Sequence, residues 1–268
     1  MTPRNRILLY IAGILIIMVS STFIFPRYGR NSDKETDTKN SQQETVIVEE
    51  KLATIGEEII EDNQDQYSIY LEKPVIVDLK DSQKQEVANL FITQSLDDLI
   101  NDFKADLPKE TTETMQSSLE GEYEAIFFSE SLFSIRITYS KYLSGATDLV
   151  IESKVLNYDI ANSKELTLDT IFNQESDYLS FLAATTSQQL TNVYSSSDKE
   201  IVNWIKNTTS AQKENFSNFG FNKEEMLIQF SNDQMGSMIA GADEVKIPAA
   251  DLLSYISDSS LKTLWEGI

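Results

Sequence analysis

An uncharged, apolar run from Ile7 to Phe25 stands apart from everything that follows it in the chain. A helix of these 19 residues would be roughly 28 Å long, about the thickness of the hydrocarbon core of a bilayer. A helix buried in a soluble core normally keeps one polar side, and this run has none. The pattern therefore predicts one N-terminal transmembrane helix over residues 7–25.

The same run could also serve as a signal peptide. The apolar part of a signal peptide is about 7–15 residues long and ends at a cleavage site of small residues. Here the run is longer, and its small cluster at residues 20–22 is followed by further apolar residues. We expect an uncleaved anchor, with residues 1–6 as a short cytoplasmic tail. Because basic residues are nearly balanced on the two sides, the orientation rests on this short tail and on the long acidic part, which we place outside the cytoplasm.

Residues 26–44 are polar and contain almost nothing to bury, so they predict a disordered stalk. The β-branched run at residues 45–48 is typical of a short strand and should begin the folded part. The segment Tyr67–Val77 alternates at its start and predicts another strand. Since Pro74 cannot donate a ladder hydrogen bond, that strand should lie at an edge or contain a bulge.

An amphipathic helix is predicted from Ser82 to Phe103, with Asp81-Ser82 as its N-cap. The apolar stripe that supports it steps by four, three and four residues, with an extension toward the start of the helix. The positions on this stripe are Ile92, Leu96, Leu99 and Phe103, with Val87, Leu90 and Phe91 as the extension.

Strand and helix patterns continue through the remaining chain. Residues 133–139 alternate strictly, which indicates one buried and one wet face. The other expected elements are strands at 122–128, 149–160, 226–230 and 245–248, a turn at 159–164, helices at 168–172, 176–216 and 250–256, and a C-terminal tail with Trp265. The mixture of the two periods predicts an α+β fold, in which a mixed, mostly antiparallel sheet is packed by helices.

The residue inventory excludes several kinds of chemistry. The chain has no cysteine and no histidine, so disulfides, thiol nucleophiles, thiolate metal sites and a Ser-His-Asp triad are impossible within it. The chain has 43 acidic residues, too many for the sequence alone to identify one pair of neighbouring carboxylates for glycoside hydrolysis. We therefore predict no catalytic residue, no metal site and no cofactor.

The charge is strongly acidic and uneven. The whole chain carries −21, and residues 31–268 carry 18 basic and 43 acidic residues, a net charge of −25. Such a surface should repel nucleic acid and attract basic partners, divalent cations or a cationic wall polymer; simple solubility is the plainer explanation. The acidic pairs lack the spacing of a calcium loop and are expected to be solvated faces. These pairs are Glu57-Glu58, Asp97-Asp98 and Glu224-Glu225.

Residues 67–257 carry an ordered set of segments that resembles a known family. The segments are Tyr67–Ile76, Lys84–Phe103, Leu132–Tyr142, Tyr158–Phe172 and Ile239–Pro248. They resemble the extracytoplasmic domain of the RsiV anti-sigma factor, a domain also found ahead of the catalytic domain of the PdaC peptidoglycan deacetylase. The resemblance implies two folded parts, a first α+β subdomain at 45–147 and a second, RsiV-like α+β subdomain at 148–268.

Three functions remain open from these observations. The resemblance favours a non-catalytic, extracytoplasmic binding or sensing module of the cell envelope, whose ligand is a cell-wall component or a basic protein such as lysozyme, the family precedent. The alternatives are a hydrolase or deacetylase of wall polymer, or its accessory domain, and a structural tether that binds a protein partner. Residues 1–6 are too short to hold a sigma factor, and no deacetylase domain is expected to follow residue 268.

The candidate ligand-binding residues follow the central strand. The resemblance implies a Gly-Gly-Ala-His loop at this point, and here Ser144-Gly145-Ala146-Thr147 keeps Gly-Ala and lacks the histidine. The loop either contacts a ligand or simply connects two strands, with Gly145 at a positive φ. Tyr139 and Tyr142 are either core and rim residues or a platform for a sugar. The predicted site is Tyr139, Tyr142, Ser144, Gly145 and Thr147.

Overall fold

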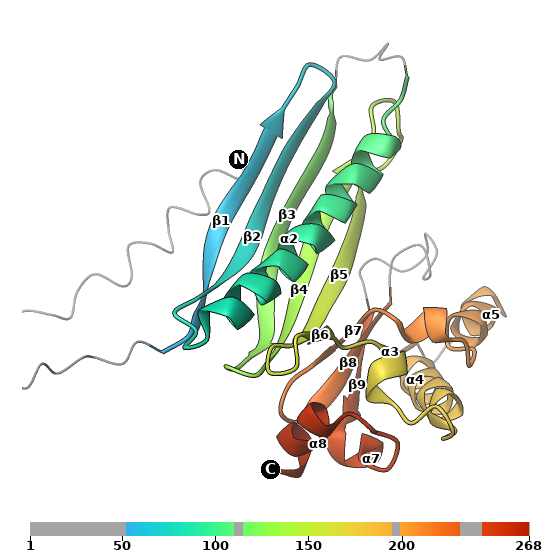
Figure 1. The fold of residues 1–268 in the computed structure, drawn as a ribbon. Helices are drawn as coiled ribbons and strands as arrows, with labels where there is room; N and C mark the ends of the chain where they lie inside the picture. The colour runs from blue at the N-terminus through green and yellow to red at the C-terminus, as the bar shows by residue number, and fades with distance from the viewer. Residues whose placement is uncertain (1–51, 110–114, 195–198, 231–242, 268) are drawn as a thin grey trace, which may run out of the picture. The chain divides into compact units, whose positions relative to one another are not determined.

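The residues that the structure describes form a six-stranded sheet and a three-stranded sheet, each covered by helices (Figure 1). The computed structural model describes residues 52–109, 115–194, 199–230 and 243–267. The expected anchor at 7–25, the stalk at 26–44 and the run at 45–48 lie outside these residues. Among the residues described, no helix is both long and apolar enough to cross a membrane.

The large sheet follows the order of the chain. Its strands are β1 (Thr54–Asn63), β2 (Tyr67–Val77), β3 (Ser117–Phe128), β4 (Leu132–Tyr142), β5 (Val150–Asp159) and β6 (Lys164–Glu165), in the order β1-β2-β3-β4-β5-β6. Only β2 and β3 pair in parallel, because α2 connects them; the other neighbours are antiparallel. The predicted α+β fold with a mixed, mostly antiparallel sheet is therefore confirmed.

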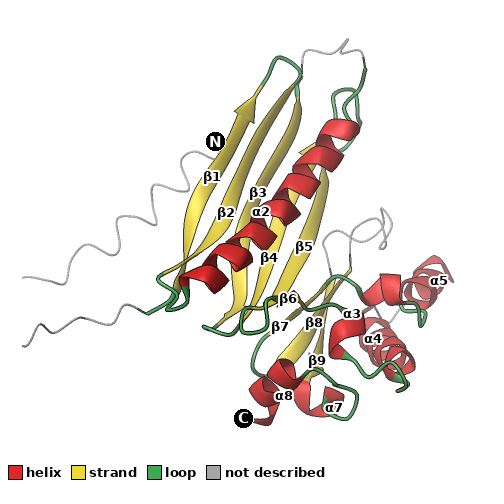
Figure 2. Ribbon diagram, viewed as in Figure 1, coloured by secondary structure: helices red, strands yellow, loops and turns green. Residues whose placement is uncertain are grey.

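Helix α2 (Ser82–Ala105) lies along one face of this sheet (Figure 2). The carboxylate of Asp81 accepts hydrogen bonds from the backbone N–H groups of Gln83 and Lys84, both at 3.1 Å, which confirms the predicted N-cap. The buried stripe is as predicted from Ile92 to Phe103. The expected extension is wrong for Val87 and Leu90, which are 38% and 53% exposed, because the helix turns Ala88, and not these residues, toward the sheet.

Strand β2 corrects the expectation drawn from Pro74. The strand is interior, since β1 pairs with Ser68–Val77 and β3 pairs with Tyr67–Leu71. Pro74 lies beyond the last β3 partner, where only β1 is bonded, so the missing N–H costs no ladder bond on that side. Strand β1 was not predicted, because its TIGEEIIEDN sequence holds four acids and no clean alternation.

The second sheet comes from the end of the chain. Its strands are β7 (Phe219–Phe221), β8 (Glu225–Phe230) and β9 (Asp243–Pro248), all antiparallel. The helices around it are α3 (Leu168–Ile171), α4 (Tyr178–Tyr194), α5 (Lys199–Thr208), the 3₁₀ turn η2 (Lys213–Phe216), α7 (Ala249–Leu252) and α8 (Ser259–Glu266). Trp265, expected in a tail, lies in α8, is 3% exposed and donates its Nε1–H to the carbonyl of Asn222 at 2.8 Å.

The short strand β7 packs directly on the face of the large sheet opposite α2. The backbone N–H of Phe221 donates to Ser134 Oγ at 3.1 Å, and Asn157 donates from Nδ2 to the carbonyl of Phe219 at 2.6 Å. A Cβ added to Gly220 would lie 2.5 Å from Ile126 Cδ1. The face of β4 that was predicted to be exposed to solvent is therefore covered by β7 near Ser134, and Ser134 is fully buried.

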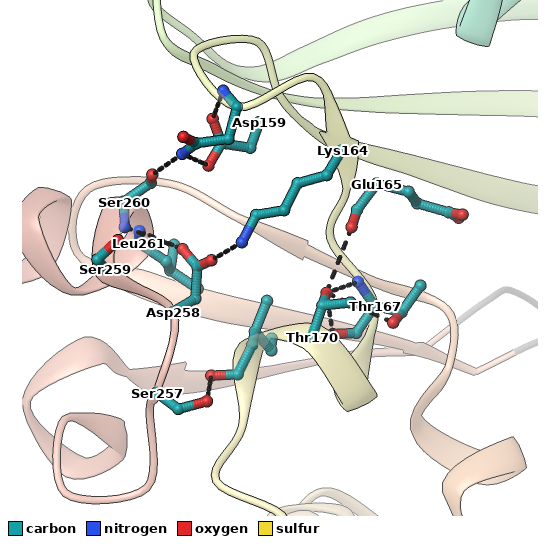
Figure 3. Close-up of polar contacts among 12 residues, drawn as sticks. Asp159, Lys164, Glu165, Thr167, Thr170, Ser257, Asp258, Ser259, Ser260 and Leu261 are labelled. Atoms are coloured by element: carbon teal, nitrogen blue, oxygen red, sulfur yellow. Dashed lines mark hydrogen bonds and ion pairs between the residues drawn. The ribbon is translucent and has the colours of Figure 1, made fainter.

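A polar joint connects the end of β5 to the start of α8 (Figure 3). Asp258 caps α8 by accepting from the N–H groups of Ser260 and Leu261, and it also binds the ammonium of Lys164 on β6. Asp159 holds the turn that follows β5 through two hydrogen bonds from Asn162, at 2.9 and 2.8 Å. Asn162 also donates to Ser260 Oγ at 3.1 Å, so the joint holds the predicted 159–164 turn against the start of α8.

The described residues belong to one compact unit that begins at Glu49. The boundary expected between residues 147 and 148 falls between β4 and β5, which pair over Leu132–Lys141 in the same sheet. The large sheet thus continues past that position, and the elements of the second sheet begin after β6.

Candidate functional site

The five predicted site residues lie along the far half of β4 and in the turn after it. Tyr139 is half-buried and donates its hydroxyl hydrogen to Glu152 Oε2 on β5 at 2.8 Å. Tyr142 ends β4, opposite Ser118. Ser144 donates its backbone N–H to Ser117 Oγ at 2.9 Å, and Thr147 is exposed. Gly145 has φ of 86°, as expected for a strand-connecting turn.

A groove runs along β5, on the side away from β4, and Tyr139 is the one predicted residue among its described lining residues. It consists of two adjoining hollows of about 480 and 400 Å³ that share Val155, Glu165, Glu214 and Ser217. The first also contains Glu152, Asn218 and Gln229, and the second contains Asn157, Leu166, Leu168, Asp169, Lys213 and Phe219. This is the size range of small-molecule sites.

The side-chain amide of Asn218 forms hydrogen bonds with the backbone of β5 within this groove. Its Oδ1 accepts from the N–H of Val155, and its Nδ2 donates to the carbonyl of Ser153, both at 2.9 Å. The side-chain amide thus takes the place of a neighbouring strand over these residues. This blocks the addition of another strand there, so the groove is suited to side-chain recognition.

Asn157, which lines the second hollow, carries an unpaired acceptor. Asn157 is 4% exposed and uses its Nδ2 to bond the carbonyl of Phe219. Its Oδ1 is buried and has no hydrogen-bond partner among the described residues. Buried amide oxygens are nearly always paired, so this one is an exception that requires an explanation.

A second notable surface is the face of the large sheet opposite α2, beyond β7. We call it the glutamate face and define it by Glu61, Glu72, Glu120, Glu122 and Glu124. In the strand register, Tyr70 lies opposite Glu61 of β1 on one side and opposite Glu120 of β3 on the other. Glu122 lies opposite Thr138 of β4. Because the alternate residues Leu119 and Ile137 are buried toward α2, these side chains point the other way.

The charges on the glutamate face are only partly compensated. Arg136 pairs with Glu124 at 3.1 Å and also binds Glu244 of β9. The pKa of Glu72 is raised above its ordinary value, first because burial removes water from the carboxylate and then because Glu57 and Glu122 lie near it. A positive ligand on this face would relieve that repulsion.

Replacing Glu72 with glutamine should therefore stabilise the protein at pH 7. A raised pKa in the folded state means that ionisation costs stability above the ordinary value of 4.5, and that this cost disappears below it. We expect a gain of less than about 1 kcal/mol, because the side chain keeps some contact with water. Urea unfolding of Glu72→Gln at pH 7 and pH 3 tests this, with the exposed Glu130→Gln as control. A gain that persists at pH 3, or a loss at pH 7, would contradict it.

The acidic pairs considered as calcium sites are dispersed in the structure. Glu58 pairs with Lys73 at 3.0 Å, and Glu225 with Lys246 at 3.3 Å, while Asp97 and Asp98 are exposed on α2. Within the described ranges, no group of three or more acidic side chains is arranged to hold a metal ion. The sequence missed Asn157, Glu165 and Glu214, which only the fold brings to one groove.

The fold defines a class of protein: an α+β module in which a helix-covered large sheet is joined to a small sheet through β7. Comparison with known families agrees with this class. Residues 169–250, from α3 into α7, match the family described as "Protein of unknown function (DUF3298)". This part of the chain is thus similar to that family, and the resemblance found in the sequence is confirmed.

Relatives and solved structures extend this result. The chain is 27% identical over 154 residues to the peptidoglycan-N-acetylmuramic acid deacetylase PdaC of Bacillus subtilis (strain 168), covering 57% of this chain but only 32% of that protein. A DUF3298 family member from Bacteroides fragilis shares the fold with a TM-score of 0.60, at 15% identity, over 81% of this chain and 99% of that one. One from Pseudomonas aeruginosa PAO1 gives 0.51, at 10% identity, over 79% and 96%.

Proposed function

We propose that this chain is a membrane-anchored, extracytoplasmic binding module of the cell envelope, and that its ligand is a basic extracellular protein such as lysozyme. The apolar run at 7–25 supports the anchor, with the N-terminus inside and the folded part outside. The observation that carries the choice of ligand is the glutamate face. Its four exposed glutamates and the half-buried Glu72 lie on three adjacent strands.

The glutamate face also offers contacts beyond charge. Tyr70, between Glu61 and Glu120 in the register, is 45% exposed, and so is Ile59, which opposes Glu72. Exposed aromatic and aliphatic side chains within a charged surface are typical of protein interfaces, where they anchor the partner after electrostatic attraction has steered it. The proposal therefore predicts binding that weakens with salt and depends on both kinds of residue.

A titration of the full chain in neutral detergent with lysozyme tests the proposal. We expect binding at about 20 mM salt that weakens several-fold at about 150 mM, because charge attraction is screened. Glu120→Lys with Glu122→Lys should weaken binding by roughly tenfold or more. The matched control, Asp97→Lys with Asp98→Lys, makes the same charge change on α2 and should have less than about a twofold effect. No binding at low salt, or equal losses in both variants, would refute the proposal.

A wall polymer is the second candidate ligand, favoured by the similarity to PdaC, whose name gives peptidoglycan as its substrate. In that case the module would bind wall material, alone or as part of a deacetylating or hydrolysing protein. Retention of the full chain on purified peptidoglycan, unchanged by reversal of Glu120 and Glu122, would favour this candidate. Release of acetate or of sugar fragments in the same assay would favour an enzyme.

A further inference from the structure

We propose that the groove along β5 is a second binding site and that it takes a protonated aliphatic primary amine. Three features of the described residues carry this inference. They are the unpaired, buried Oδ1 of Asn157, the two rim carboxylates of Glu165 and Glu214, and the apolar residues in the lining beside Asn157. An ammonium on a methylene chain satisfies all three, since it has three donors, one positive charge and an apolar stem.

The first feature is the unpaired Oδ1 of Asn157. Asn157 is 4% exposed, and its amide is held in one orientation by the 2.6 Å hydrogen bond from Nδ2 to the carbonyl of Phe219. With Nδ2 occupied, Oδ1 is left to receive a hydrogen bond, and it receives none from the described residues. A ligand that donates a hydrogen bond here would remove the cost of an unpaired buried oxygen.

The rim supplies the charge. Glu165 and Glu214 line both hollows of the groove and are exposed. Figure 3 shows that Glu165 and Lys164 extend to opposite sides of β6, so the ammonium that binds Asp258 does not face the same way as Glu165. The other groove carboxylates already have partners, since Asp169 binds Lys213 and Glu152 accepts from Tyr139. The two lysines of the lining are engaged as well, Lys213 with Asp169 and Lys154 with the carbonyl of Ser95 at 3.2 Å, so the rim favours a cation.

The shape of the groove fits an aliphatic stem. The hollow that contains Asn157 is about 400 Å³, and its lining combines polar and charged residues with four apolar ones, Val155, Leu166, Leu168 and Phe219. Its walls are held by Asn218 on the β5 backbone and by the Asp169–Lys213 pair between α3 and η2. A preformed wall lowers the entropy lost on binding.

The groove and the glutamate face share no residue, so the two sites can be tested separately. The same chemistry has two sources: the lysine side chain of a protein and a free amine. The probes are pentylamine, its neutral analogue pentanol, and Nα-acetyl-lysine-N-methylamide, each titrated into the full chain in neutral detergent and followed by calorimetry. Tighter binding of the lysine derivative than of pentylamine identifies a protein lysine as the source, and weaker binding identifies a free amine.

The expected result is saturable binding of pentylamine, at least tenfold tighter than that of pentanol. Glu165→Gln with Glu214→Gln should weaken it at least fivefold, and both positions are exposed, so folding should be unaffected. The control Glu130→Gln with Glu175→Gln removes the same charge from other exposed positions and should change affinity less than twofold. Absence of pentylamine binding, equal binding of pentanol, or equal losses in the two double variants would each overturn the proposal.

Discussion

Replacing Asp258 with alanine is expected to lower the free energy of unfolding by about 3 kcal/mol, through the loss of a helix cap and of the ion pair that its buried carboxylate makes with a partly exposed lysine. The side chain is fully buried, and it accepts from the N–H groups of Ser260 and Leu261 at 3.0 and 2.9 Å, as well as from Lys164. Alanine leaves two backbone donors without an acceptor at the start of α8. The substitution also removes the ion pair that links the start of α8 to Lys164 on β6.

Two matched variants distinguish the causes of this loss. Asp258→Asn keeps the cap and should lose about 1 kcal/mol, because asparagine caps helices nearly as well as aspartate. Lys164→Met should also lose about 1 kcal/mol or less, since the lysine side chain is 40% exposed and its partner keeps two donors. Urea unfolding followed by circular dichroism measures all three. A stability of Asp258→Ala within about 0.5 kcal/mol of the unmodified protein would contradict the role of the joint.

Replacing Gly220 with valine is expected to cost about 2–3 kcal/mol, the upper range for overpacking. Its Cβ would lie 2.5 Å from Ile126 Cδ1 and 3.1 Å from Ser134 Oγ, so either the Ile126 side chain or β7 would have to shift, and the further methyl groups of valine add to the crowding. Any shift of β7 would lengthen the hydrogen bonds from Phe221 to Ser134 and from Asn157 to Phe219. The same variant should therefore also weaken amine binding in the groove.

The control and the rescue for this prediction come from the same contacts. Gly56→Val should cost less than about 1 kcal/mol, because the nearest atom to an added Cβ there is 3.7 Å away. Ile126→Val removes the clashing Cδ1 and should restore part of the loss when combined with Gly220→Val. Equal losses at the two glycines, or no rescue by Ile126→Val, would show that close approach of β7 is not what requires Gly220.

Much of the large sheet and α2 could be predicted, because their local patterns agree with the fold. The strict alternation of residues 133–139 and the stripe from Ile92 to Phe103 each identify one buried face. The second face of β4 could not be assigned from that pattern. Its burial depends on β7, a three-residue strand whose Phe-Gly-Phe sequence is too short to show a period.

The sequence predicted residues of the candidate site only where they lie on one strand or in the turn after it. Tyr139 was found because it belongs to β4, and Gly145 has the backbone conformation expected of its turn. Asn157 sits between Leu156 and Tyr158, and alternation alone places it on a wet face. Asn157 is buried because it contacts Phe219, which lies 62 positions away in the sequence. Tertiary structure likewise brings Glu165 and Glu214 to one hollow.

Hydrogen–deuterium exchange of the full chain, with and without lysozyme at low salt, tests the central proposal most directly, because it locates the ligand on the fold. The glutamate face as binding surface predicts slower exchange in its three strands, β1 (Thr54–Asn63), β2 (Tyr67–Val77) and β3 (Ser117–Phe128), and no change in α2. Slower exchange confined to α2 or to the groove elements, or no change anywhere, would contradict the assignment of this face as the binding surface.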